Sequence, residues 1–141
     1  FTWLFTPPIS MSNAGADSIT LQFDSSWRPE DTQNARVYAT FDGGNEVDVL
    51  TLRSLGNQTE FIAKNDKIDE VFNDLENVNE TLVLTIDNPR GAKEMTVVWE
   101  MTDATNDWWW AIDNIEVSTS AFAVDADGKV ASTWGELKSR R

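Results

Sequence analysis

The chain has 141 residues, with 24 Asp and Glu against 11 Lys and Arg, and a formal net charge of −13 at pH 7. This length is typical of one domain that hides about two-thirds of its unfolded surface. The negative charge argues against binding to nucleic acid or to an anionic membrane through a basic surface. No run approaches the ~20 apolar residues of a membrane span, so we expect no membrane insertion.

The chain contains neither cysteine nor histidine. Disulfides, thiol catalysis, imidazole bases, the Ser-His-Asp arrangement and zinc held by Cys or His are therefore excluded. Carboxylate chemistry and hard, oxygen-liganded ions such as calcium remain. Two carboxylates held about 5 to 9 Å apart can hydrolyse a glycosidic bond. No pattern in the sequence singles out such a pair, so we expect no enzyme.

The first third of the chain predicts two strands. Phe1 to Phe5 is a short apolar edge strand that ends before Pro7 and Pro8. Residues 18–26 follow a turn and alternate strictly, which is typical of a half-buried strand. Residues 27–31 form a polar loop that holds Trp27.

The middle of the chain continues this pattern. Residues 35–41 and 47–52 alternate on either side of Asp42-Gly43-Gly44-Asn45, a tight hairpin signal. Residues 53–80 carry no steady period, although they contain a short strand around Phe61 and Ile62 and, as one interpretation, a short helix around Asp69 to Asp74. Residues 81–86 and 95–101 are strands. This succession predicts an all-β, antiparallel sandwich of jelly-roll type.

Three consecutive tryptophans, Trp108 to Trp110, run into an apolar and acidic strand that reaches Val117. Successive side chains of a strand point to opposite faces. Ile115 and Val117 favour the odd-numbered face as the core side, and Asp113 then lies on that side. A buried carboxylate requires hydrogen bonds or a metal ion, unless a β-bulge at Ile112 and Asp113 turns both side chains.

Three segments of the chain form a recognisable set. They are Thr2-Trp3-Leu4-Phe5-Thr6-Pro7-Pro8-Ile9, Ile19-Thr20-Leu21-Gln22-Phe23-Asp24 and Trp110-Ala111-Ile112-Asp113-Asn114-Ile115-Glu116-Val117. Together they resemble the MAM-like jelly-roll modules of secreted bacterial proteins, described as choice-of-anchor J or cleaved-adhesin domains. The similarity covers about residues 2 to 118, although the family usually has a further strand upstream. It implies a non-catalytic accessory module of an exported, multidomain bacterial protein, secreted or at the cell surface, with calcium in some members.

Aromatic side chains suggest a ligand. An exposed indole offers a flat apolar face to a sugar ring, so Trp27 in its loop, with Trp108 and Trp110 beside Asp107 at the start of the last strand, are candidate carbohydrate contacts. The alternative is that Trp3, Trp99, Trp109 and one of the other two fill the core. We expect adhesion to carbohydrate or another cell-surface polymer.

Calcium is the expected ion, if any is bound. Oxygen atoms from Asp24, Asp113 and Asn114, with Asp107 nearby, suit a hard cation that needs six to eight ligands. A bound cation also accounts for an acid on the core side of the last strand. Hydrogen bonds from loop N–H groups account for it equally well.

Residues 1–120 are expected to form the sandwich domain and residues 121–141 a C-terminal extension, in which the sign of the charge reverses. The chain begins at Phe1 without an initiator Met, so we expect a domain trimmed from a longer protein. Neighbouring domains of that protein are then partners. The rival hypothesis is a structural spacer that supports a neighbouring secreted protease, glycosidase or phosphoesterase.

Overall fold

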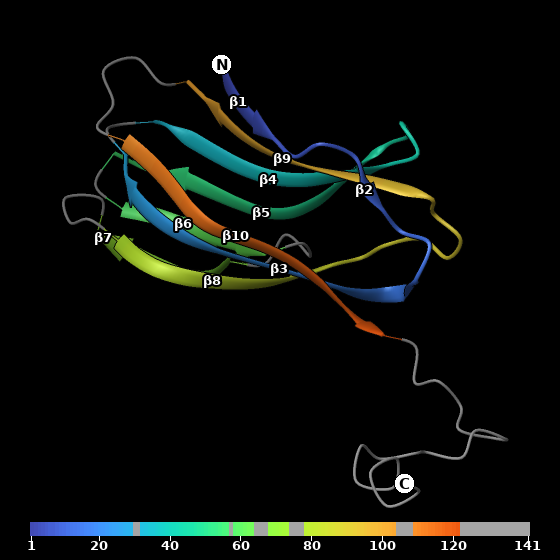
Figure 1. Cartoon of the computed structure of the whole chain (residues 1–141). Helices are drawn as coiled ribbons and strands as arrows, with labels where there is room; N and C mark the ends of the chain where they lie inside the picture. Colours follow the sequence, from blue (N-terminus) through green and yellow to red (C-terminus); the bar gives the residue numbers. More distant parts are fainter. Residues whose placement is uncertain (30–31, 57, 64–67, 74–77, 104–108, 122–141) are drawn as a thin grey trace, which may run out of the picture.

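A computed structural model describes residues 1–29, 32–56, 58–63, 68–73, 78–103 and 109–121 (Figure 1). The expected C-terminal extension lies outside these residues except for Ala121. The described elements are all strands, in the order β1 (Thr2–Phe5), β2 (Ile9–Ser10), β3 (Ala14–Arg28), β4 (Asn34–Phe41), β5 (Glu46–Ser54), β6 (Gln58–Ala63), β7 (Ile68–Asn73), β8 (Val78–Ile86), β9 (Glu94–Thr102) and β10 (Trp109–Ala121).

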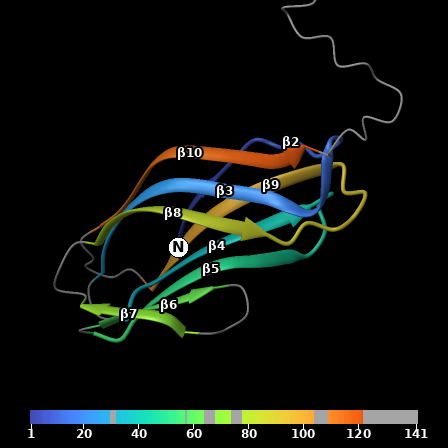
Figure 2. The ribbon, with the colours of Figure 1, turned by 90° about the horizontal axis from the view of Figure 1, so that it is seen from below.

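The strands form two antiparallel sheets packed face to face. Sheet A has the order β1-β9-β4-β5-β6-β7, with β2 also paired to β9, and sheet B has the order β10-β3-β8. Figure 2 shows the three strands of sheet B lying across β9, β4 and β5, with β6 and β7 beyond β5. β1 therefore ends one side of sheet A and β10 ends the same side of sheet B.

The chain changes sheets repeatedly. It crosses between them at β2–β3 and β3–β4, and again at each connection from β7 to β10, whereas β4 to β7 are consecutive antiparallel neighbours in sheet A. The prediction of an all-β, antiparallel sandwich is confirmed.

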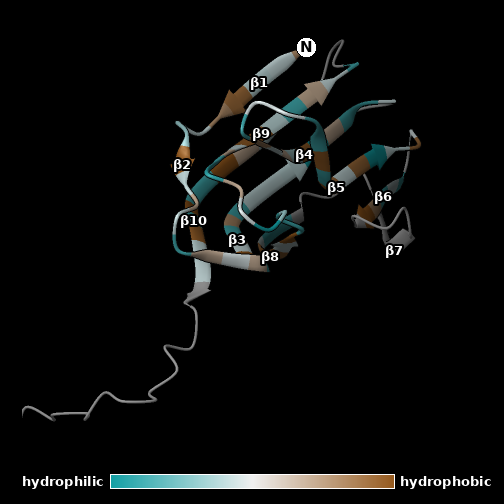
Figure 3. Ribbon diagram, turned by 90° about the vertical axis from the view of Figure 1, so that its right-hand side faces the viewer, coloured by the Kyte–Doolittle hydropathy of each residue, from teal (hydrophilic) through white to brown (hydrophobic). Residues whose placement is uncertain are grey.

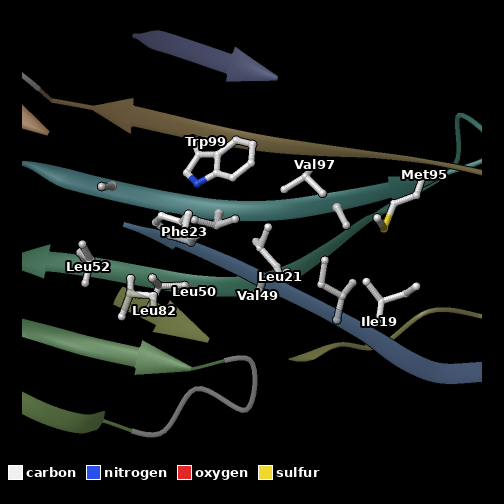
Figure 4. Close-up of a cluster of buried hydrophobic side chains, with 14 of the residues drawn as sticks. Ile19, Leu21, Phe23, Val49, Leu50, Leu52, Leu82, Met95, Val97 and Trp99 are labelled. Carbon is white, nitrogen blue, oxygen red and sulfur yellow. The ribbon is translucent and has the colours of Figure 1, made fainter. Parts of the chain in front are cut away.

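The core lies between the sheets and follows from the alternating pattern of three strands. Every second residue is buried from Ile19 onward in β3 and throughout β4, because successive side chains point to opposite faces. In β9, Met95, Val97 and Trp99 are buried in the same way, and Val98 is buried as well. Phe23 and Trp99 meet edge to face at the centre, with ring centroids 5.7 Å apart (Figure 4). The largest fully buried side chains also include Trp27, Leu21, Leu50, Leu52 and Ile86.

Two segments differ from the sequence prediction. The predicted helix around residues 69–74 is wrong, because β7 is a strand that pairs with β6 from Gln58↔Asn73 to Ile62↔Ile68. β3 also continues through the predicted loop to Arg28. Pro29 follows it, and a residue before proline favours extended backbone over helix, so the strand ends at the proline rather than before Trp27.

β10 contains a bulge that reverses its two faces. Asp113 lies opposite Asp24 and Glu116 lies opposite Gln22, so Asn114 and Ile115 together face only Phe23. Asn114 has a φ of 51°, in the left-handed region that asparagine tolerates. Before the bulge the even-numbered residues face the core, and after it the odd-numbered residues do.

The expected core face of this strand is therefore correct only after the bulge. Val117 packs against the core, but Asp113 is exposed on the outer face and Ile115 is 41% exposed. The structure contains the bulge that was one alternative for Asp113, displaced to Asn114, and the bulge turns Asp113 outward. Among the described residues, no helix is long and apolar enough to cross a membrane.

Candidate functional site

Trp27 does not lie in a loop and does not face solvent. Its side chain is 1% exposed, on the inner face of β3, and its indole Nε1 donates a hydrogen bond to the Thr59 hydroxyl at 3.2 Å. The Trp110 ring meets it edge to face, with centroids 5.8 Å apart. The prediction that Trp27 contacts a sugar is wrong, because the extension of β3 places it in the core.

Of the other predicted platform residues, the structure describes only Trp110, and this side chain is not fully exposed. Trp110 is half-buried on the inner face of β10 and donates from Nε1 to the Ser25 hydroxyl at 3.1 Å. Trp109, expected in the core, is half-buried on the outer face, where it donates to Ser26 and lies under the Arg28 guanidinium. Trp108 and Asp107 lie outside the described residues.

The three candidate calcium ligands meet on the outer face of sheet B. The Asn114 amide donates from Nδ2 to Asp24 Oδ2 at 2.6 Å, and the Thr81 hydroxyl donates to Asp24 Oδ1 at 2.6 Å. The backbone N–H of Asn114 donates to Asp113 Oδ1 at 2.8 Å. We call Asp24, Thr81, Asp113 and Asn114 the polar junction, since they link β3, β8 and β10.

Two hydrogen bonds favour the ionised form of Asp24. The bonds from Asn114 and then from Thr81 lower the pKa of Asp24, against a smaller opposite effect of desolvation. A hollow of about 590 Å³ adjoins the junction between β8 and β10 and includes Glu80 in its lining. Across the described ranges, no three Asp, Glu, His or Cys side chains are grouped to hold a metal ion. Calcium binding stays a prediction.

A different set of aromatic side chains is exposed, on the outer face of sheet A. Phe1, Trp3 and Phe5 are 80%, 55% and 65% exposed along the edge strand β1, and the Phe1 and Trp3 rings stack with centroids 5.9 Å apart at an interplanar angle of 11°. Figure 3 shows β1 at the sheet edge beside β9. Two strands further in, Tyr38 of β4 lies in register with Val98 of β9, which pairs with Phe5. We call Phe1, Trp3, Phe5 and Tyr38 the aromatic face.

Charged side chains hold the aromatic face in place. The Trp3 indole donates to Glu100 Oε1 at 2.9 Å, and the other oxygen of Glu100 lies 3.6 Å from Arg36 Nη1. The Arg36 guanidinium also bonds Glu46 and Asp48, each at 2.6 Å, and lies 4.4 Å from the centre of the Tyr38 ring. Burial, with the nearby carboxylates of Glu46 and Glu100, raises the pKa of Tyr38, so the phenol keeps its proton at neutral pH.

No protein-family model, curated protein or solved structure matches this chain. The resemblance to MAM-like modules therefore stays a prediction from the sequence.

The sequence prediction missed the aromatic face because it did not include Trp3 among the ligand contacts and considered it only as an alternative core residue. The sequence nevertheless contains a pattern that indicates an exposed aromatic row. Phe1, Trp3 and Phe5 alternate with Thr2 and Leu4, and a strand with large apolar residues on both faces is buried on both sides or exposes one face. Pro7 and Pro8 follow closely, and prolines are confined to sheet edges, which favours the second possibility.

Proposed function

We propose that this domain is a non-catalytic binding or adhesion module that recognises carbohydrate, or another surface polymer of similar chemistry, through the aromatic face. The observation that carries the proposal is the row formed by Phe1, Trp3 and Phe5 on one exposed face of β1. Folded proteins seldom expose contiguous apolar side chains of this size without a binding role.

The chemistry of the aromatic face suits a polymer of sugar rings. Aromatic rings present flat apolar area to the C–H face of a pyranose. Residues two apart on a strand are separated by about 7 Å, so a linear polymer that lies along β1 contacts more than one ring. The carboxylate of Glu100 and the phenol of Tyr38 supply the hydrogen-bonding groups that fix orientation in such sites.

The proposal extends to the parent protein. The resemblance to choice-of-anchor J and cleaved-adhesin modules supports an exported bacterial protein, secreted or at the cell surface, with this module as an accessory to other domains. Calcium, if bound, is a structural ion near the polar junction.

Affinity electrophoresis in gels that contain soluble polysaccharides, followed by titration with tryptophan fluorescence, tests the proposal. We expect at least one polysaccharide to retard the domain, and Trp3→Ala to weaken binding by about tenfold, equivalent to ~1.4 kcal/mol. Val83→Ala is the matched control, because Val83 is 61% exposed on the other sheet and its loss should leave binding unchanged. If no polysaccharide in a broad panel retards the wild-type domain, carbohydrate recognition is wrong.

A structural spacer is the second candidate, and one observation favours it. The aromatic face is an exposed apolar patch at the edge of sheet A, which is the kind of surface that a neighbouring domain covers. If the domain is a spacer, we expect a neighbouring domain to cover Trp3 in the parent protein. Hydroxyl-radical footprinting distinguishes the two: Trp3 is oxidised in the parent protein if it binds polymer, and is protected if a domain covers it.

A further inference from the structure

The outer face of sheet A carries charged side chains directly beside the aromatic face. Pairing between neighbouring strands places Glu100 of β9 between Trp3 of β1 and Arg36 of β4. One row along, Tyr38 of β4 lies opposite Asp48 of β5. Neighbouring strands lie about 5 Å apart, so a ligand that touches either Trp3 or Tyr38 is within one strand of a carboxylate.

A bulge in β5 brings two of the acids to this face. The strand contains one extra residue, Val49, where its pairing with β4 shifts. Val49 and its neighbour Leu50 are both buried, so the alternation of β5 changes face at this point. Asp48 and Glu46 point outward as a result, with 58% and 49% of their side chains exposed. Both carboxylates are accessible to a ligand on the outer face of sheet A.

Arg36 is fully engaged by acids. Each nitrogen of its guanidinium faces a different carboxylate, at 2.6, 2.6 and 3.6 Å, from Glu46, Asp48 and Glu100. Further along β5, Arg53 pairs with Glu60. Three carboxylates around one guanidinium leave an excess of negative charge beside the aromatic face. A uronate or sulfate group therefore meets like charge here, and cannot pair with Arg36 without displacing a carboxylate.

We propose that the aromatic face selects polysaccharides that carry free amino groups, such as polymers of unacetylated amino sugars. Sugar rings stack on Trp3 and Phe5, and their protonated amines lie within one strand of Glu100. Glu46 and Asp48 add to the negative potential across the same face. The exposed indole contributes as well, because aromatic faces attract cations. This inference rests on the carbohydrate binding proposed above and adds the charge of the polymer.

Isothermal titration calorimetry with three soluble oligosaccharides of equal length tests the inference. They are β-1,4-linked glucosamine, its N-acetylated form and galacturonate. At about pH 5.5, side-chain carboxylates and uronates ordinarily carry their charge, and the glucosamine amines are protonated. At about 10 mM NaCl we expect glucosamine to bind roughly fivefold more tightly than its N-acetylated form, and galacturonate to bind more weakly than both. The preference should shrink at about 300 mM NaCl, where the Debye length falls below 10 Å.

Three substitutions separate the charge beside the aromatic face from the charge of the whole chain. Glu100→Gln keeps an oxygen acceptor for the Trp3 indole, and Asp48→Asn keeps one for the Arg36 guanidinium. Each should lower the preference for glucosamine about twofold. Glu116→Gln removes the same charge from an exposed position on sheet B and should leave the preference unchanged.

The outcomes distinguish charge selection from carbohydrate binding itself. If Trp3→Ala weakens binding of every oligomer, but glucosamine and its N-acetylated form bind equally or galacturonate binds best, charge selection is wrong and carbohydrate binding stands. An equal loss of preference in Glu116→Gln and Asp48→Asn would also overturn the inference, because the net charge of the chain would then be responsible. If no oligomer binds, or if binding does not depend on Trp3, both proposals are wrong.

Discussion

Asp24 shows how a single side chain ties one sheet together. It lies on the central strand of sheet B and accepts hydrogen bonds from Thr81 on one neighbour and from Asn114 on the other. Both donors favour the charged carboxylate. An ionised Asp24 therefore stabilises the pairing of all three strands through side chains as well as backbone.

The pH dependence of stability follows from this arrangement. The pKa of Asp24 is lower in the folded chain than its ordinary value of 3.8. Its contribution is therefore complete above that value and is lost as the pH falls through the lower, folded pKa. We expect the Tm of the wild type to fall more steeply than that of Asp24→Asn between about pH 5 and about pH 2. Parallel curves would show that the two hydrogen bonds do not favour the ionised form.

At the scale of the element, the bulge in β10 determines what the strand presents to each side. It turns Asp113 outward next to Asp24 and keeps Ile112 and Val117 directed at the core. Without the extra residue, every side chain on one side of Asn114 would change face, because the side-chain period of a strand is two. The polar junction therefore depends on Asn114.

Substitutions at Asn114 should separate its backbone role from its side-chain role. Alanine and glycine both remove the hydrogen bond to Asp24, but only alanine meets the cost of a positive φ. We expect Asn114→Gly to be more stable than Asn114→Ala by about 1 kcal/mol in urea unfolding. Equal free energies of unfolding would show that the bulge relaxes on substitution. Ser118→Gly against Ser118→Ala, in the same strand after the bulge, is the control, and there alanine should be the more stable.

The strands with regular alternation were predictable, and the irregular ones were not. β4 and the part of β3 from Ile19 onward bury every second residue, and β9 buries Met95, Val97 and Trp99, so hydrophobic pattern alone assigns their inward faces correctly. Before Asn114, the even-numbered residues of β10 face the core, whereas the pattern predicts the odd-numbered ones. The prediction fails there because asparagine is common in turns and does not by itself mark a bulge. The interpretation of residues 69–74 as a helix is wrong because the strand character of β7 comes from pairing with β6, a contact that local sequence does not encode.

The candidate site was predicted only in part for similar reasons. Asp24, Asp113 and Asn114 do meet, since the order of the strands places them side by side. The prediction places Trp27 in a loop because it ends the strand at residue 26, whereas β3 continues to Arg28. Tryptophan occurs both in cores and at surfaces, so the residue type alone does not show whether it is buried. The exposure of Trp3 depends on β1 being the outermost strand of sheet A, which is a property of topology.

At the scale of the whole molecule, like charge opposes folding. A net charge of −13 on 141 residues repels itself in the compact state. The ion pairs of Arg36 and Arg53 with Glu46, Asp48, Glu60 and Glu100 act in the opposite direction. Exposed pairs contribute only ~0–1 kcal/mol each, so repulsion should dominate.

Salt should therefore stabilise the domain. Between about 10 and about 300 mM NaCl the Debye length falls from about 30 Å to below 10 Å, which screens long-range repulsion more than contact pairs. We expect the Tm to rise by several degrees at pH 7, and by much less at about pH 4, where carboxylates are partly protonated. A Tm that falls with salt at pH 7 would mean that the Arg36 and Arg53 ion pairs outweigh the repulsion.

Sheet B is built from three strands that lie far apart in the sequence, and this affects how the chain folds during synthesis. Its central strand, β3, ends at Arg28, but its two neighbours begin only at Val78 and Trp109. On the ribosome, both sides of β3 lack their final partners until most of the domain has been translated. Contacts between such distant segments make folding slow. Nascent chains that stop before β10 should therefore depend on chaperones to protect the unpaired backbone of β3 from aggregation.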